Sequence, residues 1–127
     1  LSEINYKFLN IKLTTNNRKY IHEKISLRVQ KMFKKGLIDE VVFIKDKYSL
    51  SKDSQSMKSI GYRQVLDYLE TKGTLDDLQN KCLFATRQLA KRQITWLRQF
   101  TDVIDIDISN SMSDKLKQAI DNYLQFI

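Results

Sequence analysis

The sequence predicts a mainly helical domain with one or two short strands near its ends. Two observations predict this class. Apolar residues recur at spacings of three and four through most of the chain, which is the period of an amphipathic helix, and strict alternation of apolar and polar residues occurs only near the two ends. At 127 residues the chain has the size of one domain and is long enough to bury roughly two-thirds of its unfolded surface.

The N-terminal part begins with an alternating run and continues as a helix. A half-buried strand is expected within Phe8–Leu13, where every second residue is apolar. The side chains of Thr14–Asn17 suit the N-cap of a helix, and Gly36 suits its end. The apolar positions of this helix are Ile21, Ile25, Val29, Met32 and Phe33.

A second, shorter helix is expected almost directly after Gly36, so the chain should form a hairpin or a bend there. Its apolar positions are Leu37, Val41, Ile44 and Tyr48. The segment Ser49–Ser56 is too polar to bury and predicts a mobile surface loop.

A third helix is expected from about Met57 to Lys72, with Gly73 ending it. Its apolar positions are Ile60, Val65, Leu66 and Leu69. Thr74, with Asp77 three residues later, resembles a capping box that begins the next helix.

The fourth helix, about Leu75 to Phe100, separates two chemistries onto opposite faces. An apolar stripe is formed by Leu75, Leu78, Cys82, Ala85, Leu89, Trp96 and Phe100. A cationic face is formed by Arg87, Lys91, Thr95 and Arg98, with Arg92 beside the apolar edge. One face is therefore expected to pack on a core while the other presents cations in a row.

The C-terminal tail predicts a strand followed by a helix. The segment Val103–Ile108 carries isoleucine at every second position and is the clearest strand signal in the chain. Ser111 or Ser113 is expected to cap the last amphipathic helix. The apolar positions of that helix are Leu116, Ile120, Tyr123, Leu124 and Ile127. No linker or internal repeat divides the sequence.

The composition favours an anionic partner and excludes several kinds of site. The formal net charge is +7, which points to nucleic acid as the partner class. One cysteine and one histidine exclude an internal disulfide and a four-ligand zinc site. The chain has only three glycines and so lacks a glycine-rich loop for a diphosphate. We expect no membrane span, no secretion signal and a cytoplasmic location.

The cationic face has two interpretations. A charged helix face is usually a solvated face, but Arg87, Lys91 and Arg98 have hardly an acid among them. Such a row can follow a nucleic-acid backbone. For Trp96, packing in the core is the first interpretation and stacking on a base is the second.

Three further residues allow a functional or an ordinary role. Tyr62 lies near the expected start of the third helix, where unpaired backbone amides favour an anion, and its ring could stack on a base. The alternative is that Tyr62 packs at the edge of the core and Arg63 is solvated. His22 is expected to be a surface or core-edge residue, because no nucleophile or acid is placed to use it. Cys82 is expected to act as a small hydrophobic residue.

Two stretches of the chain, Ile60–Gln64 followed by Tyr68–Glu70, and Ala85–Arg98, resemble the C-terminal signatures of the tRNA dimethylallyltransferases. Their order and separation are also those of the family, and Ile25–Val41 is similar to its preceding helix and glycine turn. The resemblance covers the chain from about Ile11 to Arg98. No Cys/His zinc-finger extension follows, which favours the bacterial type.

Two departures from the family pattern leave the matching stretches untouched. Thr71 and Lys72 precede Gly73 where the family often has glycine directly after its Leu-Glu pair. Asn16–Asn17 stands where proline or aspartate is common.

The resemblance implies transfer of a dimethylallyl group from dimethylallyl diphosphate to N6 of the adenosine that follows the tRNA anticodon, with Mg2+ assisting the diphosphate. It implies a monomeric enzyme with a P-loop-type α/β core, of which residues 1–127 would be the helical C-terminal part. The phosphate loop and the catalytic aspartate of the family have no counterpart here, and the chain begins with Leu1. We therefore expect a fragment that has no catalytic residue of its own and is inactive alone.

The resemblance also implies which residues contact the tRNA anticodon stem-loop. They are Lys58, Ser59, Ile60, Gly61, Tyr62 and Arg63 in the first segment and Lys91, Arg92, Gln93, Ile94, Thr95, Trp96, Leu97 and Arg98 in the second. Arg28 and Arg87 are further contacts of the tRNA or the diphosphate. The alternatives are a freestanding basic helical RNA-binding module and, less favoured, a helical protein-interaction adaptor.

Overall fold

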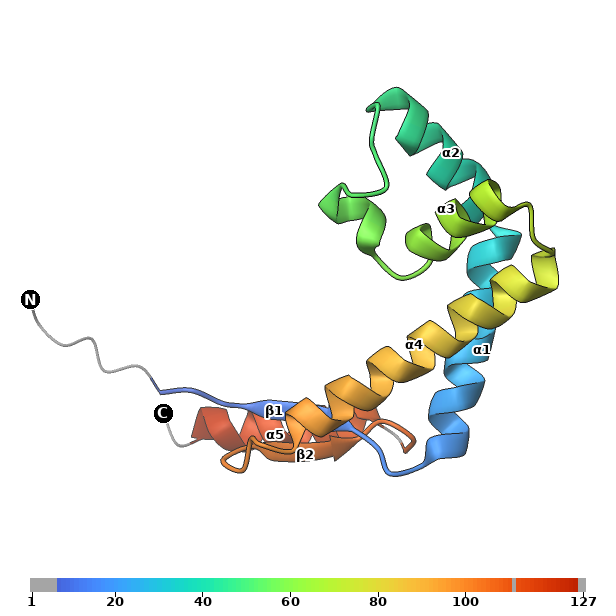
Figure 1. Cartoon of the computed structure of the whole chain (residues 1–127). Helices are drawn as coiled ribbons and strands as arrows, with labels where there is room; N and C mark the ends of the chain where they lie inside the picture. The colour runs from blue at the N-terminus through green and yellow to red at the C-terminus, as the bar shows by residue number, and fades with distance from the viewer. Residues whose placement is uncertain (1–6, 111, 126–127) are drawn as a thin grey trace, which may run out of the picture. The chain divides into compact units, whose positions relative to one another are not determined.

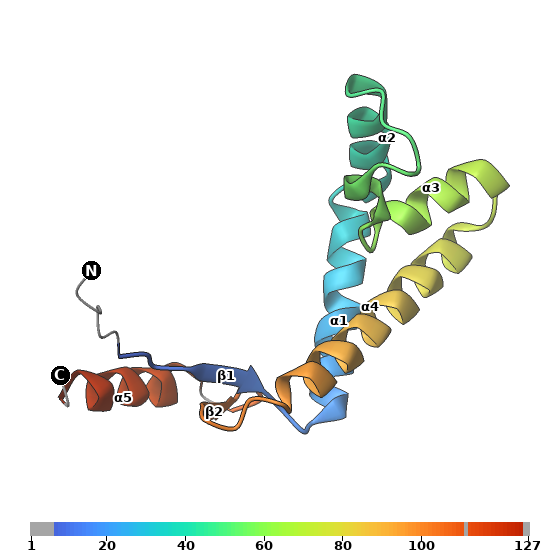
Figure 2. The ribbon, with the colours of Figure 1, turned by 60° about the vertical axis from the view of Figure 1, so that its left-hand side comes forward.

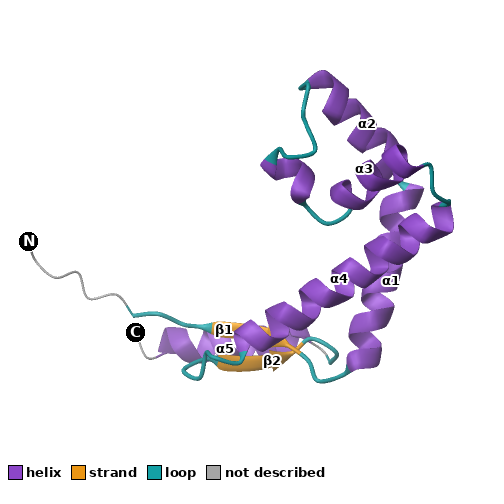
Figure 3. Ribbon diagram, in the orientation of Figure 1, coloured by secondary structure: helices purple, strands orange, loops and turns teal. Residues whose placement is uncertain are grey.

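The computed structural model describes residues 7–110 and 112–125 and confirms the predicted class, with helices predominating over two short strands (Figure 3). In chain order the elements are β1 (Ile11–Thr14), α1 (Arg18–Lys34), α2 (Leu37–Lys47), the 3-10 helix η1 (Gln55–Lys58), α3 (Tyr62–Thr71), α4 (Leu75–Leu97), β2 (Ile104–Asp107) and α5 (Met112–Gln125). None of these helices combines the length and apolar character that crossing a membrane requires.

The fold divides into two compact units. The first contains Leu1–Ile21 and Gln93–Ile127, and the second contains His22–Arg92. The boundaries fall inside α1 and α4 rather than at a linker, which is why no change in composition marks them in the sequence.

The first unit is built on a parallel pair of strands. β1 pairs with β2 in the register Ile11 to Ile104 through Thr14 to Asp107, and α5 packs beside β2 (Figure 1). Both strands are shorter than predicted. Ile106 is the buried centre of this unit, whereas Ile104 is 40% exposed, so only part of the predicted apolar face is covered.

The ends of these strands are tied together by side chains. Thr15 is buried, and its hydroxyl donates to Ser109 Oγ at 3.2 Å. Asn17 caps α1 as predicted, because its Oδ1 accepts from the Tyr20 N–H at 3.0 Å. Only Thr15, Asn16 and Asn17 therefore separate β1 from α1.

The second unit has a core to which every element contributes. Its buried residues are Ile25 and Val29 of α1, Leu37 and Val41 of α2, Met57 of η1, Val65 and Leu66 of α3, and Leu78 and Cys82 of α4. The predicted bend between the first two helices is confirmed: Gly36 has φ 89° and ψ 38°, a left-handed conformation that suits glycine. α2 then packs against α3 (Figure 2).

The predicted third helix is wrong at its start and is one residue too long at its end. The chain forms η1, breaks at Ser59–Gly61 and resumes as α3 only at Tyr62. The break lies at Gly61, whose φ of 98° and ψ of −61° no α-helix contains. At the other end Lys72, not Gly73, adopts the left-handed conformation that ends the helix.

The polar loop before η1 is anchored at one point. Lys52 Nζ lies 3.1 Å from Asp67 Oδ1 and 2.8 Å from Glu70 Oε2, both on α3. The expected surface position of the loop is confirmed, and these ion pairs join it to the helix.

Several details of the last two helices also differ from the sequence prediction. α4 ends at Leu97 instead of Phe100. At its start Thr74 caps the helix as expected, because Thr74 Oγ1 accepts a hydrogen bond from the Asp77 N–H at 3.2 Å. Ser113 lies inside α5 and is not its cap, while Ser111 and Ile127 lie outside the described residues. Ala119 is the residue of α5 that is buried, and Ile120 and Leu124 are exposed.

Candidate nucleic-acid interface

Lys58–Arg63 and Lys91–Arg98, the two segments expected to contact tRNA, are called the matching segments below. The first of them, Lys58–Arg63, forms the break between η1 and α3. Lys58, Ser59 and Arg63 are exposed, Ile60 and Tyr62 are half-buried, and Gly61 is buried. The segment therefore presents two cations and one aromatic ring around a turn whose centre packs into the unit.

Gly61 fits this turn because it has no side chain. A Cβ at this position would stand 3.2 Å from Met32 Cε and 3.8 Å from Leu37 Cδ2. The backbone of the segment thus approaches the junction of α1 and α2 closely, and the positive φ adds a second reason for glycine.

The backbone amides of Gly61 and Arg63, at the start of α3, are not unpaired as expected for an anion site. The Gly61 N–H donates to Gln64 Oε1 at 2.8 Å, and the Arg63 N–H donates to Ser59 O at 3.0 Å. Because these donors have partners, phosphate binding here would depend on the side chains of Lys58 and Arg63.

Tyr62 is held by Glu40, a residue outside both segments. Its phenol donates a hydrogen bond to Glu40 Oε1 on α2. That bond, with partial burial, raises the pKa of the Tyr62 phenol, so the group stays a protonated donor at neutral pH. Glu40 lies 22 positions away in sequence, and the periodicity of α2 carries no signal for this contact.

The second matching segment, Lys91–Arg98, forms the C-terminal part of α4 and the residue after it. Six of its eight residues are exposed, namely Lys91, Arg92, Gln93, Thr95, Trp96 and Arg98, while Ile94 and Leu97 are half-buried. Lys91 and Arg92 belong to the second unit and the remaining six residues to the first. The cations predicted at Lys91 and Arg98 are therefore accessible.

Trp96 corrects the expectation that it packs in the core. Its side chain is 61% exposed, and its only ring neighbour among the described residues is Phe100, with 4.7 Å between centroids and 70° between planes. Leu75 and Phe100, at the two ends of the predicted apolar stripe, are exposed as well, whereas Leu78 and Cys82 are buried. An exposed tryptophan between cations suits stacking on a base.

The two further arginines lie in different environments. Arg28 is exposed on α1, as a contact to an external anion requires. Arg87 is half-buried, and its Nε is buried without a hydrogen-bond partner. Arg87 is therefore less exposed than Lys91 and Arg98 on the same predicted cationic face.

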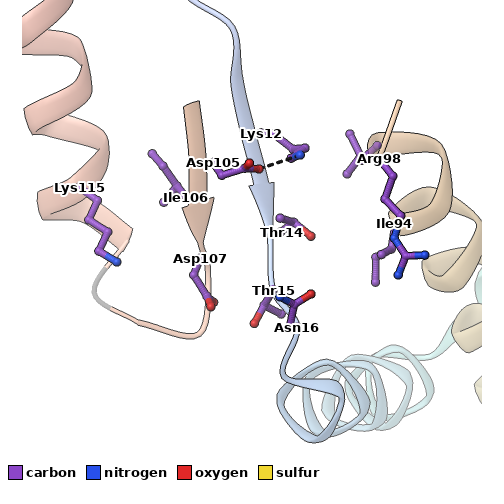
Figure 4. Close-up of a pocket in the computed structure, with 11 residues that line it drawn as sticks. Lys12, Thr14, Thr15, Asn16, Ile94, Arg98, Asp105, Ile106, Asp107 and Lys115 are labelled. Carbon is purple, nitrogen blue, oxygen red and sulfur yellow. Dashed lines mark ion pairs between the residues drawn. The ribbon is translucent and has the colours of Figure 1, made fainter. Parts of the chain in front are cut away.

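A pocket of about 370 Å³ lies in the first unit, beside the carboxyl ends of the two strands (Figure 4). Its lining includes Ile94, Leu97 and Arg98 of the second matching segment. The other lining residues are Lys12, Thr14, Thr15, Asn16, Asp105, Ile106, Asp107 and Lys115. Lys12 and Lys115 have no distinguishing pattern in the sequence, and only the folded structure brings them into the same pocket lining as Arg98.

Metal-ligating side chains do not gather in this interface. Within residues 7–110 and 112–125, no three His, Cys, Asp or Glu side chains lie close enough to hold a metal ion. His22 is exposed on α1.

Cys82 is expected to react slowly in the folded protein. It is 2% exposed, and burial raises the pKa of its thiol from 9.0 to about 11. We expect a disulfide reagent at pH 8 to modify the native protein at least about tenfold more slowly than the urea-unfolded protein, because the thiolate is the nucleophile. Equal rates in the two states would contradict the burial.

The same shift predicts a pH dependence of stability. The raised native pKa of Cys82 means that the unfolded thiol ionises first, so its contribution to stability is complete below pH 9.0 and is lost as the pH rises toward about 11. A Cys82→Ser variant should lack this dependence in urea titrations between these pH values.

Comparison with known proteins shows one consistent relationship. The family model described as IPP transferase matches residues 2–100. A tRNA dimethylallyltransferase of Nitrosomonas eutropha is 40% identical over 120 residues, covering 94% of this chain and 37% of that protein. A tRNA dimethylallyltransferase of Nitrosospira multiformis is 40% identical over 119 residues.

Two solved structures have the same fold over nearly the whole chain. The full-length tRNA isopentenylpyrophosphate transferase from Bacillus halodurans superposes with a TM-score of 0.82 at 32% identity, covering 98% of this chain and 40% of that one. The tRNA delta(2)-isopentenylpyrophosphate transferase of Staphylococcus epidermidis gives 0.80 at 27% identity, covering 94% and 39%. The chain thus spans less than half the length of the relatives it matches.

Proposed function

The chain belongs to the IPP transferase family, and on that premise we propose that it is the tRNA-contacting part of a tRNA dimethylallyltransferase. The observation that carries the proposal is the exposure of the Lys91–Arg98 segment, which offers three cations and Trp96 to solvent. Cations of this kind position a nucleic-acid backbone, and an exposed indole stacks on an unpaired base.

The proposed reaction moves a dimethylallyl group from its diphosphate to N6 of the adenosine that follows the anticodon. The carbon–oxygen bond to the diphosphate breaks, a carbon–nitrogen bond forms, the diphosphate leaves and the amine loses a proton. In this scheme the chain binds and orients the anticodon stem-loop through its two segments. A base must leave the stack before it can react. Trp96 in the first unit and Tyr62 in the second each offer a ring on which an unpaired base can stack.

We propose no metal ligand and no catalytic group within this chain. In the full enzyme Mg2+ would assist the departure of the diphosphate. The described residues contain no cluster of metal-ligating side chains that fits such an ion. Arg28, exposed on α1, is the residue proposed to approach the diphosphate.

A chimera tests the proposal without depending on activity of the chain alone. The Nitrosomonas eutropha relative would carry the matching part of this chain in place of its own matching residues. We expect the chimera to transfer labelled dimethylallyl groups to unmodified tRNA and the isolated chain only to bind the tRNA. A folded chimera that binds dimethylallyl diphosphate but neither binds tRNA nor transfers label would contradict the proposal. Retention of RNA binding without transfer would favour a freestanding RNA-binding module.

Tyr62 provides a prediction about stacking. Tyr62→Ala should weaken binding of the anticodon stem-loop about tenfold, because one base–aromatic stack contributes roughly 1–3 kcal/mol. Tyr62→Phe keeps the ring and loses only the hydrogen bond to Glu40, so its affinity should fall less. Fluorescence anisotropy with labelled RNA measures both.

Tyr48 is the matched control for this experiment. It is 60% exposed at the end of α2 and lies outside both matching segments. Tyr48→Ala should leave RNA affinity within about twofold, since it removes no proposed stacking partner. An equal loss in the Tyr48 and Tyr62 variants would remove Tyr62 from the interface.

A further inference from the structure

We propose that the pocket at the carboxyl ends of β1 and β2 binds the backbone of the bound RNA, with Lys115 contacting a phosphate group as well as Arg98. This inference rests on the proposed function and extends it to α5. Lys115 lies outside both matching segments and beyond residue 100, where the family match ends. The last helix would then take part in substrate binding as well as covering the sheet.

The location is one that parallel strands favour for ligands. β1 and β2 run in the same direction, so both chains leave the sheet at the same edge, and ligands commonly bind outside the carboxyl ends of such strands. In Figure 4 Arg98 lies to one side of the strand pair and Lys115, at the start of α5, to the other. Two cations from distant parts of the sequence thus line the same pocket from opposite sides of the strand pair.

The carboxylates of the pocket are already engaged by the protein. Asp105 Oδ1 pairs with Lys12 Nζ at 2.8 Å. Asp107 Oδ1 accepts from Ser109 Oγ at 2.6 Å and from the Ser109 N–H at 2.8 Å. These bonds to Ser109, with Thr15 and the charge of Lys115, lower the pKa of Asp107. One oxygen of each carboxylate is therefore engaged by the protein.

The two remaining cations of the pocket are less engaged by the protein. Among the described residues Arg98 makes no ion pair or side-chain hydrogen bond, and Lys115 is linked only by the electrostatic attraction to Asp107. The hydroxyl of Thr14 and the amide of Asn16 also line the pocket and can donate. The pocket lining therefore carries three cations, Lys12, Arg98 and Lys115, and two carboxylates, so its formal charge is positive.

The kind of charge present suits phosphate. A guanidinium presents several N–H donors in a planar fork that fits phosphate oxygens, and an ammonium adds a compact charge. The first turn of α5, which contains Lys115, also carries the partial positive charge of a helix N-terminus. Because Arg98 belongs to the exposed segment proposed to contact RNA, a backbone phosphate is the source that we assign.

The test compares two lysines of α5. Lys115 lines the pocket, whereas Lys117 is exposed on the same helix and does not. We expect Lys115→Ala to weaken binding of the anticodon stem-loop about fivefold and to reduce the slope of log affinity against log salt by about 0.7–0.9. Lys117→Ala should change neither beyond about twofold, and Lys115→Arg should retain most of the affinity because it keeps the charge.

Competition with free phosphates and a comparison of the variants distinguish the possible outcomes. Sodium diphosphate and inorganic phosphate, titrated at constant ionic strength, should compete with RNA no better than chloride. Competition that Lys115→Ala abolishes, with unchanged RNA affinity, would assign the pocket to free diphosphate and overturn the RNA assignment. If Arg98→Ala weakens RNA binding but Lys115→Ala equals Lys117→Ala, the pocket inference fails and the proposed function stands. If none of the variants affects RNA binding, the proposed function itself fails.

Discussion

Replacing Gly61 with alanine should lower the free energy of unfolding by about 2 kcal/mol, because residues held in sparsely populated backbone regions cost roughly 1–3 kcal/mol each. Gly61 has φ 98° and ψ −61°, a combination that side chains rarely tolerate. The new Cβ would also stand 3.2 Å from Met32 Cε, and that flexible methyl group can move aside at small cost. The backbone conformation therefore accounts for most of the expected loss, which urea unfolding measures.

Gly73 is the matched control for Gly61. A Cβ there would lie 3.7 Å from Thr71 Oγ1, an ordinary contact, and its φ is not positive. Gly73→Ala should be close to neutral or slightly stabilising, since alanine reduces the entropy of the unfolded chain. Equal destabilisation by the two variants would show that the turn at Ser59–Gly61 does not depend on glycine.

Removing two exposed cations, Lys91 in α4 and Arg98 directly after it, should have the largest effect on RNA binding. The double variant Lys91→Ala with Arg98→Ala should bind the anticodon stem-loop about 30-fold more weakly. It should also show a salt dependence shallower by about 1.5 in log–log slope, because each lost phosphate contact removes roughly 0.7–0.9 from the slope. Anisotropy titrations at several salt concentrations measure both quantities.

A control with the same change in net charge separates local contact from the general field of a basic protein. Lys81 on α4 and Lys45 on α2 are exposed and lie outside both matching segments. The double variant Lys81→Ala with Lys45→Ala should lose less than about threefold in affinity, since long-range attraction between exposed charges is screened by salt. A similar loss in both double variants would mean that net charge, not the Lys91–Arg98 segment, determines binding.

The helical periodicity of α4 predicted which residues could face a core, but not how far the core extends. Leu78 and Cys82 are buried as expected, whereas Trp96 continues the same stripe and is exposed. A spacing of three and four defines a face of the helix. It does not indicate where along that face the packing partner ends.

The break before α3 was missed for a related reason. Ile60 and Val65 fit a helical spacing on both sides of Gly61, and an isolated glycine is tolerated in helices. The close packing of the turn against Met32, which favours the break, is a contact between distant parts of the chain. Local pattern alone therefore predicted a continuous helix.

The matching segments identified the candidate interface, but their supporting contacts depend on tertiary structure. The hydrogen bond from Tyr62 to Glu40 spans 22 positions, and the one from Thr15 to Ser109 spans 94. The strands were each predicted from alternation, yet their parallel pairing, which creates the pocket edge, brings together residues from the two ends of the sequence. Such pairings follow from the fold as a whole rather than from any local signal.

Photo-crosslinking tests most directly whether the two segments contact tRNA. An anticodon stem-loop carrying 4-thiouridine would be irradiated with the chain and the crosslinked peptides identified by mass spectrometry. The account predicts crosslinks within Lys58–Arg63 and Lys91–Arg98. The exposed aromatic end of α2 offers a rival surface, where Lys47 Nζ lies 5.4 Å from the Phe43 ring centroid and 5.3 Å from that of Tyr48. Crosslinks confined to that surface, with none in the two segments, would contradict the account.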